Sequence, residues 1–382
     1  MTLTSTLCVR GFSVTSICLW LICLIGAGLN GAINTTQAQT RAYVATGGSL
    51  TVIDTDTNAV VGSITVCTDF TCSPVIPAVT PNGARVYVTN ISQGTVSVID
   101  TLTNTVVDTI TVGERPLGIA ITPDGTRAYV ANNSGTISVI DTNANAVIAT
   151  IPDTDLPLGV AITPDGARAY VSNAAGSISV VDISTNTIIT NIPVLDFPVP
   201  GFGFPARDLA GIAITPDGTR AYVVSHSTAK TYVISTITNT MIATIRTDPG
   251  APLSIAISPD GTRAYTATVG GSFAHVSVID TATNTISATI PAGGAPPFVG
   301  VTPDGTKLYV DAEMAVTIID TATNSIVTQI PLTLPTLGVA FGTLPPVPHS
   351  KDDCKNSGYQ QFSVLGFRNQ GQCVKYVNEH AN

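Results

Sequence analysis

Few residues of this 382-residue chain are of the types that carry out acid–base or metal chemistry. Among its four histidines, His226 and His275 lie in corresponding loops of neighbouring repeats, where they could hold a metal ion with Asp311 or Glu313. Exposed loop histidines are more often solvated than metal-bound, so we predict no metal and no cofactor. We find no Ser-His-Asp set with a nucleophile elbow, no phosphate-cradling glycine loop and no Walker pattern. We therefore assign no catalytic residue.

The basic residues divide into scaffold positions and candidate ligand contacts. Beyond Arg10 the chain has 15 lysines and arginines, four of them within residues 351–382. Seven recur at one position of an internal repeat, where we expect them to pair with turn carboxylates: Arg41, Arg85, Arg127, Arg168, Arg220, Arg263 and Lys307. The four that fit neither group are Arg115, Arg207, Lys230 and Arg246.

The elements that must position these side chains follow from the repeat. Its clearest copy has apolar and β-branched runs at 117–122, 127–132, 136–141 and 146–151, which predict four short strands, A to D. The A–B turn is Thr-Pro-Asp-Gly, and the C–D turn contains Asp and Asn, residues that bond their own backbone in turns. The third run ends once in each of seven units, at Asp54, Asp100, Asp141, Asp182, Ser235, Asp280 and Asp320.

Four strands in about 40–45 residues are the signature of a β-propeller blade. Residues 41–44 begin at a B strand, and a left-over A strand at 337–341 follows the seventh unit. We therefore predict an all-β, seven-bladed propeller over residues 41–342, with one blade built from both ends of the chain. Blades buried on both faces explain the continuous apolar runs and the low share of charged residues, 11%.

The connections of such a propeller lie on two faces. The repeated A–B and C–D turns form what we call the regular face, and the D–A and B–C connections form the variable face. Insertions and nine acidic residues, Asp153 and Asp311 among them, lie on the variable face and outnumber its four bases. Segment 198–205 is either an apolar recognition loop or a cap. Because variable loops on a rigid scaffold commonly carry binding, we predict these binding residues: Arg115, Arg207, Asp208, His226, Lys230, Arg246, Asp248 and His275.

The string Tyr87-Val88-Thr89-Asn90, followed by Gly94-Thr95-Val96-Ser97-Val98-Ile99-Asp100, resembles the YVTN family of β-propeller repeat proteins. The resemblance covers nearly all of residues 41–342 and implies a bacterial or archaeal surface-layer or periplasmic protein. Most members have no assigned activity, and one periplasmic branch is associated with single-stranded DNA binding. The wider group includes lactonases, quinoprotein amine dehydrogenases and the propeller of nitrous oxide reductase, and fold alone does not choose among them.

The N-terminus and the cysteines predict export. Arg10, the apolar stretch 17–25 and small or polar residues near 36–38 are typical of a secretory signal peptide, which we place at 1–38; a retained anchor is the alternative. No second stretch of about 18 apolar residues follows, so we expect no span in the mature chain. Beyond the signal we expect the disulfides Cys67–Cys72 and Cys354–Cys373, with a zinc site of four thiolates as the alternative.

The C-terminal region is a separate element. Residues 343–350 form a proline-rich, stiff linker to a small element at 351–382, pinned by Cys354 and Cys373. This element resembles short cysteine-paired tails at the ends of exported bacterial proteins. It either docks to envelope components or to the propeller, or it is inert.

Together these features favour an exported, non-enzymatic binding or structural propeller of the bacterial cell envelope, in the periplasm, on the cell surface or outside the cell. Its partner would be a protein, a glycan or a small molecule at the variable face. A lactonase- or dehydrogenase-like enzyme is the first alternative, and a single-stranded DNA-binding protein is the second. The net charge of −9 and the few aromatic residues argue against nucleic acid.

Overall fold

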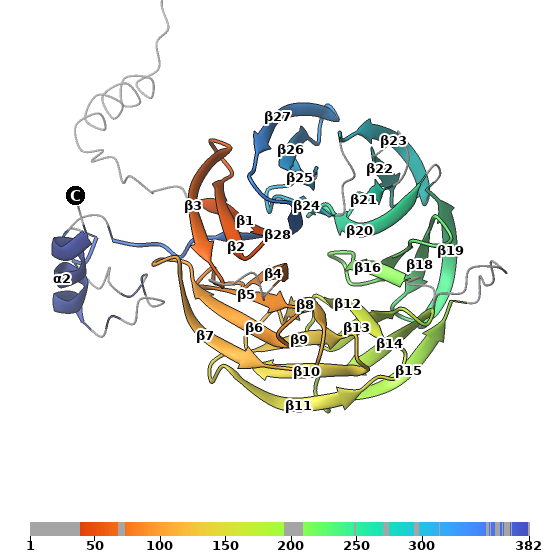
Figure 1. Cartoon of the computed structure of the whole chain (residues 1–382), viewed down its shortest axis with the longest axis horizontal. Helices are drawn as coiled ribbons and strands as arrows, with labels where there is room; N and C mark the ends of the chain where they lie inside the picture. The colour runs from red at the N-terminus through yellow and green to blue at the C-terminus, as the bar shows by residue number, and fades with distance from the viewer. Residues whose placement is uncertain are drawn as a thin grey trace, which may run out of the picture. The chain divides into compact units, whose positions relative to one another are not determined.

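The computed structural model describes residues 39–67, 73–194, 209–247, 250–269, 275–293, 298–312, 314–348, 351, 353–355, 360, 362, 367 and 369–380. Within these residues, 28 strands form seven antiparallel sheets of four strands each, arranged as blades around a ring (Figure 1). The predicted seven-bladed propeller is thus confirmed. We number the blades from the one that contains β1.

In each blade the four strands lie side by side, and their order is counted here from the ring axis outwards. The innermost strands are β28 (Thr336–Thr343), β4 (Pro74–Val79), β8 (Pro116–Ile121), β12 (Pro157–Ile162), β16 (Leu209–Ile214), β20 (Ala251–Ile257) and β24 (Val299–Val301). The second strands are β1 (Thr40–Thr46), β5 (Arg85–Asn90), β9 (Arg127–Asn132), β13 (Arg168–Asn173), β17 (Arg220–Ser225), β21 (Arg263–Val269) and β25 (Lys307–Asp311). The third strands are β2 (Ser49–Asp54), β6 (Thr95–Asp100), β10 (Thr136–Asp141), β14 (Ser177–Asp182), β18 (Lys230–Ser235), β22 (His275–Asp280) and β26 (Ala315–Asp320). The outermost strands are β3 (Ala59–Thr65), β7 (Thr105–Thr111), β11 (Ala146–Pro152), β15 (Thr187–Pro193), β19 (Thr240–Arg246), β23 (Thr285–Pro291) and β27 (Ser325–Pro331).

Blade 1 closes the ring with strands from both ends of the propeller sequence, as predicted. The C-terminal strand β28 pairs with β1, in a register that places Val339 opposite Val44, and the two lie side by side in Figure 1. Each innermost strand contacts the next around the whole ring, including β24 with β28 and β28 with β4. Gly83 permits this closure, because a Cβ atom there would lie 1.7 Å from the Thr343 carbonyl oxygen.

The core lies between neighbouring blades. Second and third strands are buried along nearly their whole length, whereas the outermost strands alternate between exposed and covered residues. Seven apolar clusters each join side chains of two adjacent blades. Burial on both faces of the inner strands accounts for their apolar sequences without a membrane.

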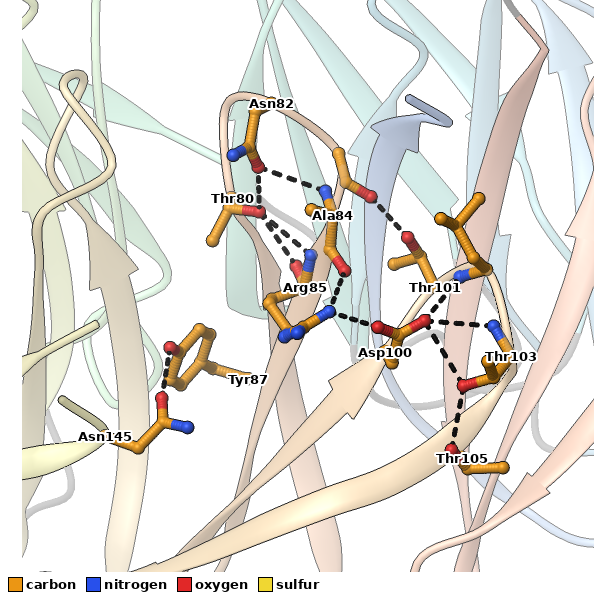
Figure 2. Close-up of polar contacts among 12 residues, drawn as sticks. Thr80, Asn82, Ala84, Arg85, Tyr87, Asp100, Thr101, Thr103, Thr105 and Asn145 are labelled. Atoms are coloured by element: carbon orange, nitrogen blue, oxygen red, sulfur yellow. Dashed lines mark hydrogen bonds and ion pairs between the residues drawn. The ribbon is translucent and has the colours of Figure 1, made fainter. Parts of the chain in front are cut away.

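Polar side chains tie together the A–B and C–D turns of a blade on the regular face, as blade 2 shows (Figure 2). In blade 2, the Thr80 hydroxyl donates to Asn82 Oδ1 at 2.7 Å. Asp100 Oδ1 accepts from the Thr103 N–H at 3.0 Å, and the Thr101 hydroxyl donates to the Gly83 carbonyl at 2.6 Å. Four other blades repeat the last bond, so the turn sequence recurs because it joins the two turns.

A second repeated contact joins neighbouring blades. The buried Tyr87 hydroxyl donates to Oδ1 of Asn145 in the C–D turn of the next blade, at 2.8 Å (Figure 2). We call this contact the tyrosine–asparagine bridge. It recurs at Tyr129–Asn186, Tyr170–Asn239, Tyr222–Asn284 and Tyr309–Asn58. At the two remaining junctions, Asn104 Oδ1 and Asn324 Oδ1 are buried without a partner in the described part of the chain.

The repeated basic residues differ from the prediction in their partners. Arg85 pairs with the Asp100 carboxylate. The others mostly reach the next blade, where they donate to backbone carbonyls of its C–D turn: Arg127 to Ile183, Arg168 to Thr236, Arg220 to Thr281, Arg263 to Thr321 and Lys307 to Thr55. Turn carbonyls carry lone pairs that need donors, so these side chains hold blades together and the expected carboxylate pairing is the exception.

The C-terminal element contains the predicted disulfide Cys354–Cys373 and a helix that was not predicted, α2 (Gln370–His380). Phe362 and Val377 pack with the two cysteines in a small apolar cluster. Cys67 is also disulfide-bonded, and its expected partner Cys72 lies outside the described residues, as do residues 1–38. The disulfides contradict the alternative of a four-thiolate zinc site. No helix in the described residues has the length and apolarity to cross a membrane.

Candidate functional site

Backbone hydrogen bonds place the B–C and D–A connections of a blade at the same end. The N–H of Val112 donates to the Gly94 carbonyl at 2.9 Å, and the N–H of Thr247 donates to the Ala229 carbonyl at 3.0 Å. The same bond recurs in blades 1, 3, 4 and 7, where it fixes the roots of the variable-face connections on the sheet.

The predicted binding residues that the structure describes concentrate on blade 5. His226, Lys230 and Arg246 all belong to it. Arg115 lies apart, in the connection from β7 to β8, with a left-handed backbone at φ 55°. The predicted residues Arg207, Asp208 and Asp248 lie outside the described residues.

Lys230 and Arg246 form a cross-strand pair at the variable-face end of blade 5. The register of β18 and β19 puts them directly opposite each other, with Ser225 of β17 on the other side of Lys230. Residues directly opposite in an antiparallel sheet project from the same face, with Cβ atoms about 5 Å apart. The Lys230 and Arg246 side chains therefore project from the same face of the sheet.

No other blade carries a charged pair at this position. The equivalent pairs are Ser49–Thr65, Thr95–Thr111, Thr136–Pro152, Ser177–Pro193, His275–Pro291 and Ala315–Pro331. Facing like charges at this distance destabilise a sheet. The pair in blade 5 is therefore a departure from the repeat.

The hydroxyl network next to this pair is also altered. In blades 2 to 4 a buried asparagine donates to two hydroxyls, as Asn132 does to Thr136 at 3.1 Å and to Ser138 at 2.9 Å. Blade 5 has Ser225 in place of this asparagine, together with the buried Tyr232. The Thr228 hydroxyl donates to the Ser225 hydroxyl at 2.8 Å and lies 3.1 Å from the Tyr232 hydroxyl.

The two loop histidines differ in exposure. His226 is exposed in the turn after β17, and partial desolvation lowers its pKa, so its imidazole is neutral at neutral pH. His275 begins β22 and is only 4% exposed, which removes it from the surface where a ligand would be met. Across the described ranges, no three His, Cys, Asp or Glu side chains gather as metal ligands would.

Two acids that were counted as surface charges are buried. Asp153 is 3% exposed, and burial raises its pKa. Asp311 is fully buried, and burial raises its pKa to about 8, against the smaller lowering effect of the Thr336 hydroxyl and the Gly338 N–H. The variable face is therefore less acidic than the sequence count indicated.

Asp311 occupies a position where other blades have a hydroxyl. Thr89 and Ser172 stand at the equivalent place and donate to the carbonyls of Leu117 and Ala210, on the innermost strand of the next blade. Asp311 instead has the Thr336 hydroxyl and the Gly338 N–H of β28 beside it, and both lower its pKa. The loss of hydration on burial outweighs them and keeps the carboxyl protonated at neutral pH.

Two elements of the site were missed at the sequence level. The pairing of Lys230 with Arg246 follows from aligning the third and fourth strands of every unit, a signal that was present in the repeat. Clefts on the regular face, between blades 5 and 6 and between blades 6 and 7, left no signal because repeated turns line them.

Comparison with known proteins supports the fold alone. No protein-family model matches the sequence, and no curated protein matches it either. A structure of a functionally unknown protein from Desulfotomaculum acetoxidans is similar, with a TM-score of 0.64 and 20% identity, covering 80% of this chain and 99% of that one. A candidate 6-phosphogluconolactonase from Bacteroides fragilis gives 0.63 and 18%, covering 81% and 99%. Hydrazine synthase from Kuenenia stuttgartiensis gives 0.61 and 22%, covering 69% and 88%.

Proposed function

We propose that this protein is an exported, non-enzymatic binding propeller of the YVTN type, which holds an anionic group of its ligand at the variable face of blade 5. The observation that carries the proposal is the Lys230–Arg246 pair, a facing pair of cations where all six other blades have small or uncharged residues or a buried histidine. The ligand is a small molecule, or part of a glycan or protein, that bears a carboxylate or phosphate.

The chemistry of the pair suits an oxyanion. The Arg246 guanidinium offers a planar set of N–H donors that matches two oxygens at once, and the Lys230 ammonium adds a mobile point charge. The exposed His226 imidazole, neutral at neutral pH, can add one N–H donor from the adjacent turn.

Calorimetric titration of the full chain with inorganic phosphate at low ionic strength tests the proposal. The variant Lys230→Thr with Arg246→Thr restores the Thr–Thr pair of blade 2 and should fold normally. We expect phosphate affinity to fall at least tenfold, which corresponds to about 1.4 kcal/mol. Added salt should weaken binding to the native chain.

A matched control separates local from overall charge. Lys355→Gln with Lys375→Gln removes two positive charges from the C-terminal element and should leave phosphate affinity unchanged. Equal loss in both double variants, or no phosphate binding by the native chain, would contradict the site.

The non-enzymatic part needs its own test. Hydrolysis of 6-phosphogluconolactone or a simple lactone by the purified chain, abolished in His226→Ala, would overturn it. For export, the intact mass of protein recovered outside the cytoplasm should correspond to a chain lacking about residues 1–38. A full-length mass would contradict cleavage.

A further inference from the structure

A cleft opens on the regular face between blades 6 and 7. It has a volume of about 530 Å³, and Asp260, Arg263 and Tyr265 of blade 6 line it together with Asp304 and Thr321 of blade 7. The corresponding turns of blades 5 and 6 line a cleft of about 200 Å³. The same parts of the repeat therefore form two clefts of different size.

The larger cleft lies at a junction that lacks the tyrosine–asparagine bridge. At the smaller cleft, the Tyr222 hydroxyl donates to Asn284 Oδ1 at 2.7 Å. At the larger one, Tyr265 interacts with Arg263, and Asn324 Oδ1 is buried without a partner among the described residues. Asn324 belongs to the turn that contributes Thr321 to the cleft wall. A buried acceptor without a donor is costly, so this junction is less completely hydrogen-bonded than the junction at the smaller cleft.

The polar groups that line this cleft include both hydrogen-bond acceptors and hydrogen-bond donors. Asp260 accepts bonds from the Ser258 hydroxyl and the Thr262 N–H, which lower its pKa and keep it ionised. Asp304 is held in the same way within its own turn, and its pKa is lowered as well. Each carboxylate has about four lone-pair sites, so both retain acceptor capacity.

Donors stand beside these acceptors. One nitrogen of the Arg263 guanidinium donates to the Thr321 carbonyl at 2.6 Å. Arginine carries five N–H donors, which leaves further ones for a ligand. Both carboxylates and the Thr262 side chain are at the exposed mouth, whereas Tyr265 and Thr321 form a buried floor.

We propose that the cleft between blades 6 and 7 binds a saccharide unit. A sugar hydroxyl both donates and accepts, so neighbouring hydroxyls can bond a carboxylate and the guanidinium at once. An alkylammonium ligand would meet the Arg263 charge, and an oxyanion would meet Asp260 and Asp304. The site is on the opposite face from Lys230 and Arg246 and does not depend on the function proposed for them.

Saturation-transfer difference NMR on the full chain, with glucose and N-acetylglucosamine as probes, tests this proposal. Ala322 is exposed at the lip of the larger cleft, and Ala282 occupies the same place in the smaller one. Ala322→Trp should fill the larger cleft and reduce saturation transfer at least tenfold. Ala282→Trp, an equally exposed change one blade earlier, should leave it unchanged.

Each outcome of this experiment either supports or overturns the saccharide site. Transfer to at least one sugar that is lost only in Ala322→Trp, with both variants folded by thermal unfolding, supports the site. Absence of transfer to both sugars, transfer that persists in Ala322→Trp, or equal loss in the two variants overturns it.

Discussion

The two faces of the propeller use the same repeat in opposite ways. On the regular face, repeated side chains bond the other turn of the blade, as Thr101 bonds Gly83, or the next blade, as Tyr87 bonds Asn145. On the variable face, backbone bonds hold the roots of the connections, and the side chains above them differ from blade to blade. The repeat is therefore kept where side chains join turns and blades, and it varies in the connections of the opposite face.

The largest loss of stability is expected for Gly83→Ala. Its Cβ would lie 1.7 Å from the Thr343 carbonyl, so β28 would have to move at the point where the ring closes. Gly166 has the same φ of 70° but meets only Pro123 Cδ at 3.6 Å. In urea unfolding, we expect Gly83→Ala to lose more than about 3 kcal/mol and Gly166→Ala about 1 kcal/mol. Equal losses would show that backbone conformation alone, not ring closure, determines the cost.

A second effect, which depends on pH, is expected at Asp311, the buried carboxyl near the variable face. Its folded-state pKa of about 8 lies above the ordinary value near 4, so only the unfolded chain loses this proton between those pH values. The group therefore lowers stability as pH rises from about 4 to 8, with no further loss above 8.

Asp311→Asn should remove this dependence. We expect equal stability of variant and native chain at pH 4, and a variant more stable by about 5 kcal/mol at pH 8, in denaturant unfolding at both pH values. A difference that does not change with pH would show that Asp311 is ionised in the folded protein.

The smallest effect on stability is expected from the tyrosine–asparagine bridge, which is present at some blade junctions and missing at others. Tyr170→Phe removes the bridge to Asn239 and should cost about 1 kcal/mol of stability. Tyr265→Phe removes a hydroxyl that makes no bridge to Asn324 and should cost less. Thermal unfolding of both variants compares them, and an equal or larger loss for Tyr265→Phe would contradict the assignment of the bridge.

Much of this architecture was predictable because the repeat carries it. The blade count, the shared blade and the Cys354–Cys373 pair follow from spacing alone. The partners of the repeated arginines did not follow, because a backbone carbonyl of the next blade leaves no trace in the sequence. Burial of Asp311 was hidden for a related reason: its position is recognised only by aligning it with Thr89 and Ser172, which face the next blade.

Helix α2 and the regular-face cleft were beyond sequence reasoning. The helix contains Gly371 and the β-branched residues Val374 and Val377, which weaken a propensity signal, and it packs around a disulfide in a short element. The cleft lies where the bridge between Tyr265 and Asn324 is missing, although both residues match the repeat.

The central claim is that blade 5 differs from the other blades because it holds an anion on the variable face. Crystals of the full chain soaked in selenate, with the anion located from its anomalous signal, test this claim most directly. We predict a selenate within hydrogen-bonding distance of both Lys230 and Arg246, which disappears in the Lys230→Thr, Arg246→Thr variant. A signal confined to other places, or one that persists there in the variant, would contradict the claim.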